Sequence, residues 1–206
     1  ANSWKGEEGR FNLLTGDAKF TDAEFVAPFE QMAKWGAYMG KGYQSQGYSD
    51  SQQLFALGRS AIYPTGSWDI GYFNENAISE FGAFKPPVAN KGDECYISDH
   101  TDIGMGINAN SPNKEEAQIF LNWLSSAEFA DLFTNNVTGF FSLSSHDVEV
   151  EDPVAAEMIS WRSECNSTIR LNAQIMNRGE PSMENELWNV GSKVLNGKMT
   201  AMEAAE

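Results

Sequence analysis

The sequence predicts an α/β fold, on three observations. Amphipathic stripes with recognisable caps indicate several helices, and short β-type runs at 60–63 and 95–109 lie between them. The third observation is size, because 206 residues with 41% hydrophobic and 12% aromatic content can bury a substantial core. Strands interleaved with helices are typical of α/β or mixed architectures.

The charge of the chain excludes several classes of partner. Fourteen Lys and Arg against 29 Asp and Glu give a net charge of −15. Such a field repels phosphate backbones and anionic membranes, so we expect no nucleic-acid partner. No apolar run reaches the roughly 18 residues of a membrane helix.

The first strong helix signal is T-D-A-E at 21–24, which matches a capping box. An apolar stripe at helical spacing follows it and predicts a buried face, with Pro28 bending the helix or delaying its start. The stripe consists of Phe25, Phe29, Met32, Trp35 and Met39.

A shorter helix is predicted over 49–59, closed by Gly58, and S-A-I-Y at 60–63 then reads as a buried strand. The strand leads into P-T-G-S-W-D, which breaks at Pro64 and Gly66 and places Trp68 beside an acid. Trp68 is either core filling at this turn or a flat platform for a ligand.

The middle of the chain predicts extended structure over 95–109, where Gly104 and Gly106 would let the backbone approach something closely. Ser111-Pro112 predicts a helix start, and Ser125 with Glu128 predicts another through a capping box. The buried stripe of the first of these helices is expected at Ala117, Phe120, Leu121 and Leu124.

Three helices are predicted in the last third. Asp152-Pro153 begins one that runs through Met158 and Trp161. Ser182 caps the next and Gly197 ends it, with a stripe at Met183, Leu187, Val190, Val194 and Leu195. Thr200 and Glu203 cap the last.

The two cysteines, Cys95 and Cys165, have no C-x-x-C or zinc spacing, so no metal site is expected. They form one disulfide in an oxidising compartment or remain buried thiols in a reducing one, and the sequence leaves both open.

Several motifs occur in a characteristic order: F-x-x-G-R-S-A-I-Y-P-T-G-S-W-D, K-P-P, G-M-G-I-N-A-N-S-P-N-K-E-E-A-Q-I-F-L-N-W-L, and P-x-x-x-x-x-L-W. In this order they resemble the extracellular solute-binding proteins of bacterial ABC importers, and within them the carbohydrate-binding, maltose-binding-protein-like group. The resemblance runs from about Phe20 to Glu206. It implies an exported receptor that binds a mono- or oligosaccharide between two lobes and delivers it to a membrane permease.

The resemblance also implies a type II periplasmic binding protein fold whose members are about twice as long. Residues 1–96 and 140–206 resemble the C-terminal lobe, and 97–139 resemble the segment that crosses into the N-terminal lobe, whose first half is absent. We therefore expect a fragment with a one-sided cleft that binds sugar weakly or not at all. Self-association through the edge left open is a further expectation.

Sugars present flat C–H faces and rims of hydroxyls, so aromatic planes and paired acids are the groups to seek. Trp68 and Trp188 resemble the stacking tryptophans of the family. Asp102, with Asp99 as the alternative and His100 between them, lies where the stretch resembles the part of the family's site that binds sugar hydroxyls. From its residues alone, the same stretch reads as a capped turn. The remaining candidates are Asp69, Glu184 and Arg170. For Asp69, capping of the helix that follows is favoured over binding of a sugar hydroxyl.

Three functions remain in view. The first is a sugar receptor without chemistry or cofactor, which touches a membrane only through the permease or through a lipid anchor outside this chain. The second is a receptor for a polyamine or other cation, with Asp99 and Asp102 as counter-charges. The third is a glycoside hydrolase or lyase with a pair of acids as acid and base. Asp99 and Asp102 are one such pair, whereas Glu184 and Glu186 are two apart on a predicted helix and so do not face each other.

Overall fold

A computed structural model describes residues 2–99, 101, 103–142, 144–169 and 178–206. The chain divides into two compact units, each of which is built from segments distant in sequence. The first comprises Ala1–Ser45, Pro86–His100 and Arg162–Glu206, and the second comprises Gln46–Lys85 and Thr101–Trp161. Among the described residues, no helix has the length and apolar character needed to cross a membrane.

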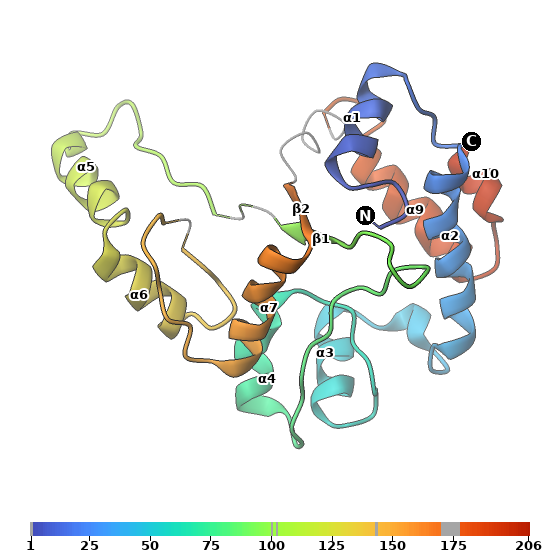
Figure 1. Ribbon diagram of the computed structural model, residues 1–206, viewed down its shortest axis with the longest axis horizontal. Coiled ribbons are helices and arrows are strands. Elements are labelled where there is room, and N and C mark those ends of the chain that lie inside the picture. The colour runs from blue at the N-terminus through green and yellow to red at the C-terminus, as the bar shows by residue number, and fades with distance from the viewer. Residues whose placement is uncertain (1, 100, 102, 143, 170–177) are drawn as a thin grey trace. The chain divides into compact units, whose positions relative to one another are not determined.

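The first unit is centred on three helices that pack side by side, α2 (Ala23–Trp35), α9 (Met183–Leu195) and α10 (Ala201–Ala205) (Figure 1). Their shared core consists of Val26, Phe29, Val194 and Ala205. Helix α9, predicted from a cap and a stripe, and helix α10, predicted from its cap, are both confirmed as helices. The capping box of α10 is complete, since Thr200 Oγ1 accepts from the Glu203 amide at 3.2 Å and Glu203 Oε2 accepts from the Thr200 amide at 2.8 Å.

Details of the predicted α2 are wrong at both ends. The helix begins after Asp22 instead of Thr21, because Asp22 accepts from the Lys19 amide and forms the turn itself. It ends at Trp35, which is 48% exposed, and Met39 lies beyond it. The stripe is therefore buried only through its first turns, where α9 and α10 cover it. Pro28 lies within the helix.

The first unit also contains helix α1 (Glu7–Thr15), the short turns η1 (Gly36–Tyr38) and η2 (Tyr43–Ser45), and a two-stranded sheet. Strand β1 (Tyr96–Asp99) pairs in parallel with β2 (Asn166–Ile169), with Tyr96 opposite Asn166. A disulfide joins Cys95 and Cys165, the residues directly before the two strands. This small parallel sheet among helices confirms the predicted α/β class.

The second unit contains α3 (Tyr48–Ala56), η3 (Ser67–Asp69), α4 (Ile70–Asn76), α5 (Lys114–Trp123), α6 (Ala127–Asn136) and most of α7 (Pro153–Glu164). Aromatic rings form one of its cores: the Phe55 and Phe73 centroids lie 4.8 Å apart, and Tyr63 and Phe81 pack edge-on to Phe73. The predicted start of α7 is confirmed, because Asp152 Oδ1 accepts from the Ala155 amide at 2.8 Å.

Several predictions for the second unit are wrong. Residues 60–63 form no strand, and Ile62 is 61% exposed, because no described strand pairs with this run. Helix α5 starts two residues late, at Lys114 instead of Pro112, since its N-cap is Asn113, and it buries no residue fully. Ser126 caps α6 in place of Ser125, and Glu128 accepts from the Trp123 indole instead.

Among the described residues, a Cβ atom at Gly104 or Gly106 would meet nothing within 4 Å, so no described protein segment approaches either glycine closely. Two expectations for α9 fail: Ser182 stands at the N-cap position but makes no side-chain capping bond, and Leu187 of the predicted stripe is 43% exposed.

Candidate functional site

Trp68 lies in the turn η3, at the point where the chain enters α4. Its indole folds back over Gly66, where an added Cβ would fall 2.2 Å from ring carbon Cζ3. The residue is nevertheless 43% exposed. It is therefore no enclosed core tryptophan: the backbone of Gly66 supports its ring, and much of its surface faces solvent.

The edge of the indole is held by Tyr48, the first residue of α3. Trp68 Nε1–H donates to the Tyr48 hydroxyl at 2.8 Å, and that hydroxyl donates to Asp69 Oδ1 at 2.6 Å. A tyrosine from one helix thus connects the indole to the acid that follows it in sequence.

Asp69 is the centre of this arrangement, at only 2% exposed. Its carboxylate also accepts from Gln52 Nε2 at 2.7 Å and from the Thr65 hydroxyl. Burial of a carboxylate is tolerated where donors satisfy it, and three side chains do so here. We call Tyr48, Gln52, Thr65, Trp68 and Asp69 the Asp69 cluster.

The predicted capping role of Asp69 is wrong. The residue stands at the N-cap position of α4, but its side chain bonds to no amide of that helix. The physical reason is competition, because the carboxylate is already committed to the three side-chain donors of the Asp69 cluster.

The phenols near Asp69 titrate above the ordinary range. Partial burial raises the pKa of Tyr48, and the hydrogen bond that it donates to Asp69 adds to the effect. Burial likewise raises the pKa of Tyr63, with a smaller contribution from the charge of Asp69. Tyr48 therefore keeps its hydroxyl proton, and with it the bond to Asp69, throughout the neutral range.

Gly139 supports the turn that carries Trp68. Its φ is 89°, and a Cβ there would fall 1.8 Å from the Ser67 carbonyl oxygen. Only glycine combines this backbone conformation with such a close approach. Nothing in the sequence around Gly139 indicates that it packs on the Trp68 turn.

The candidates Trp188, Glu184 and Asp99 belong to the first unit. Trp188 is 74% exposed on α9, whose buried edge is formed by Gly191 and Val194. Glu184 lies in the first turn of the same helix and is exposed. Both residues therefore lie off the buried stripe.

Asp99 lies at the end of β1 and is engaged within the protein. Its Oδ2 accepts from Arg162 Nε at 2.9 Å and from Ser167 Oγ at 3.0 Å. Three predicted site residues, His100, Asp102 and Arg170, lie outside the described residues.

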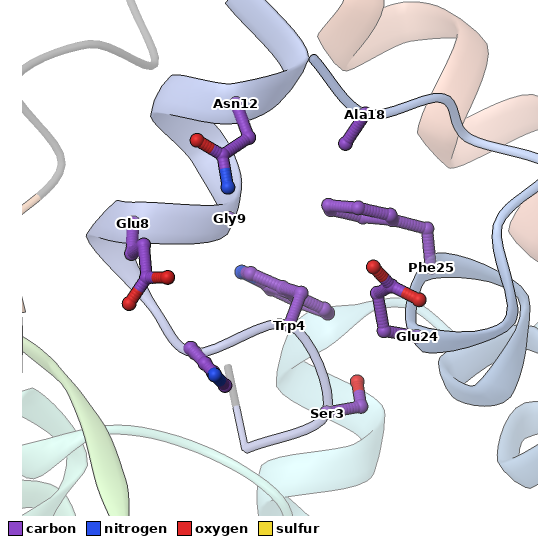
Figure 2. A pocket seen from close by; sticks show the side chains of 9 residues that line it. Ser3, Trp4, Glu8, Gly9, Asn12, Ala18, Glu24 and Phe25 are labelled. Carbon is purple, nitrogen blue, oxygen red and sulfur yellow. The ribbon is translucent and has the colours of Figure 1, made fainter.

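A pocket of about 320 Å³ in the first unit was not anticipated from the sequence. The Trp4 and Phe25 rings stack within it, with centroids 6.2 Å apart, and Glu8 and Glu24 lie on either side of the Trp4 ring in the view of Figure 2. A turn with positive φ at Lys5 and Gly6 places Trp4 there. The stacked rings join the segment before α1 to helix α2.

Comparison with solved structures finds a chitin oligosaccharide binding protein with a TM-score of 0.72 and 22% identity. The match covers 98% of this chain and 52% of that one, so the chain spans about half the length of this neighbour. At this identity the likeness shows a shared fold. No curated protein gives a significant match.

A family model, described as bacterial extracellular solute-binding protein, matches residues 8–157. That stretch is well over half of the 206 residues, and it contains the complete Asp69 cluster. The chain therefore belongs to the bacterial extracellular solute-binding protein family.

Proposed function

We propose that this chain is part of a sugar-binding receptor of an ABC importer, and that Trp68 is a stacking platform for the sugar. The observation that carries the proposal is the state of Trp68 in a solute-binding protein: 43% exposed, supported by Gly66 and held at its edge by Tyr48. A large exposed ring fixed in this way suits the flat C–H face of a sugar.

The name of the structural neighbour supports the choice of ligand. That protein is described as binding chitin oligosaccharides, and it shares the fold over nearly the whole of this chain. A neutral mono- or oligosaccharide is therefore the ligand class that we propose. Trp188, exposed on α9, is the second proposed contact, and Glu184 in the same helix is a proposed hydroxyl acceptor.

The cationic ligand is less well supported than the sugar. It required Asp99 as a free counter-charge, and Asp99 is already paired with Arg162 and bonded to Ser167. We retain the sugar receptor as the conclusion, with no chemistry performed on the ligand.

Export and transport complete the proposal. The family is extracellular, and the disulfide between Cys95 and Cys165 is the kind of bond that persists outside the cytosol. We propose that the loaded receptor delivers its sugar to a permease. We also propose the lobe assignment given above, with 97–139 as the crossing segment.

The proposal is tested by titrating the chain with a panel of chito- and malto-oligosaccharides. Because we expect weak binding by this chain, NMR at millimolar sugar is the suitable method. The indole N–H resonance of Trp68, assigned with Trp68→Phe, should shift saturably, and Trp68→Ala should weaken binding by about 10-fold or more, since it removes a large apolar contact.

The matched control is Trp35→Ala, because Trp35 is a similarly exposed tryptophan at 48% and lies outside the proposed site. It should leave the titration unchanged. Product formation in a time course would show an enzyme, and a strong loss of affinity with salt would show a cation receptor. Either result, or equal effects of both tryptophan variants, would overturn the proposal.

A further inference from the structure

We infer that Tyr48 and Asp69 are positioning residues that fix the orientation of the Trp68 indole. The inference rests on the proposed function in one respect, which is that the oriented indole is the surface that meets a sugar. The orientation itself is a property of the unliganded protein.

The direction of the hydrogen bonds follows from the chemistry of the three groups. An indole N–H can only donate, so the Tyr48 oxygen must be the acceptor of the 2.8 Å bond from Trp68. A tyrosine hydroxyl has a single hydrogen, which is then directed at Asp69 Oδ1, 2.6 Å away. Asp69 thus fixes the rotation of the hydroxyl, and the hydroxyl presents a lone pair to the indole.

The position of Asp69 is itself fixed. The residue is 2% exposed, and the donors Gln52 and Thr65 occupy the carboxylate together with Tyr48. Tyr48 and Gln52 are four residues apart on α3, so both project from one face of that helix toward Asp69. The cluster therefore ties the turn η3 to a helix rather than to a loop.

The backbone holds the indole from other directions. The ring lies against Gly66, and Gly139 backs the Ser67 carbonyl in the same turn. With its edge bonded to Tyr48 and its ring supported by Gly66, the indole has little freedom to change rotamer. A platform ordered before binding loses less conformational entropy when the sugar arrives.

The test compares Tyr48→Phe with Tyr38→Phe. The first variant removes only the oxygen that links Trp68 to Asp69, and the second removes the same atom from a tyrosine that is 88% exposed. In the unliganded protein, Tyr48→Phe should shift the Trp68 indole N–H resonance and speed its exchange with solvent by about 10-fold, as expected for a lost hydrogen bond. Tyr38→Phe should change neither.

A second pair of variants, Asp69→Asn and Asp69→Ala, tests whether Asp69 acts on the indole through the Tyr48 hydroxyl. Asn keeps one acceptor oxygen, so it should disturb the indole resonance less than Ala does. If Asp69→Ala fails to fold, the Tyr48→Phe comparison still decides the matter.

The two hypotheses fail separately. An unchanged Trp68 resonance and exchange rate in Tyr48→Phe would overturn the positioning role, whatever the sugar data show. A shifted resonance in Tyr48→Phe, beside sugar titrations that Trp35→Ala weakens as much as Trp68→Ala, supports the positioning role and overturns the proposed function. If both hold, Tyr48→Phe should weaken sugar binding by about 3-fold, less than Trp68→Ala does, because the ring remains but is no longer held.

Discussion

Removal of the disulfide between Cys95 and Cys165 should destabilise the protein by about 4 kcal/mol. The two cysteines are 70 residues apart, and cross-linking a loop of that length removes chain entropy from the unfolded state worth about 4 kcal/mol. Most small proteins have a total stability of about 5–15 kcal/mol, so the loss is a large fraction of what is available.

Loss of the disulfide should also loosen the two-stranded sheet more than the rest of the first unit. β1 and β2 form a two-stranded parallel ladder of four residues each, and the disulfide joins the residues that precede both strands. An isolated two-stranded sheet is marginal in water. Without the cross-link, the amides of β1 should therefore exchange with solvent faster than those of the helices α2 and α9.

The assay is urea unfolding of the Cys95→Ser, Cys165→Ser double variant beside the unmodified protein. With a slope of about 2 kcal/mol per molar urea, the midpoint should fall by about 2 M. The unmodified protein unfolded in the presence of a reductant is the matched control, and it should coincide with the variant. A midpoint shift below about 0.5 M, or two titratable thiols in the unmodified protein, would refute the reasoning.

Three further predictions follow from particular contacts. Val194→Ala should lower the free energy of unfolding, measured by calorimetry, by about 2 kcal/mol because Val194 is 1% exposed in the helical core. Leu187→Ala on the same helix should lower it by less than about half as much, because Leu187 is 43% exposed. In the same calorimetric assay, Asp152→Ala should lower the free energy of unfolding by about 1 kcal/mol. Asp152→Asn should lower it less, because an Asn side chain can also accept from the Ala155 amide. Because the pKa of Tyr48 is raised in the folded protein, its contribution to stability is present below about pH 10 and is lost as pH rises through that pKa. Tyr48→Phe should flatten this alkaline decline in stability, measured by chemical denaturation at a series of pH values.

Helices whose cap or stripe is matched by the surrounding structure were predictable from the sequence. The predicted caps of α10 and α7 form, and the stripe of α9 is packed at Val194. For α5 the local pattern is equally clear, yet Phe120 is 51% exposed. An apolar stripe shows that a helix has a face to bury, and only the surroundings decide whether that face is covered.

The strand predicted at 60–63 failed for a related reason. β-branched and aromatic residues favour extended backbone, but a strand exists only where a neighbour accepts its hydrogen bonds. β1 found that neighbour in β2, about 70 residues later in the chain, with Tyr96 opposite Asn166. No pattern within 60–63 distinguishes a segment with such a partner from one without.

The candidate site shows the same division between local and non-local information. Trp68 could be selected from its sequence because P-T-G-S-W-D places a large ring at a sharp turn beside a glycine. Its partner Tyr48 could not, since an exposed tyrosine at a helix start carries no mark of the acid 21 residues later. Asp69 was assigned to capping, which is the usual role of an acid at that position. The three donors that converge on Asp69 come from two segments, α3 and the residues before η3, so a carboxylate that would cap a helix in isolation is directed instead toward the hydroxyl that holds the indole.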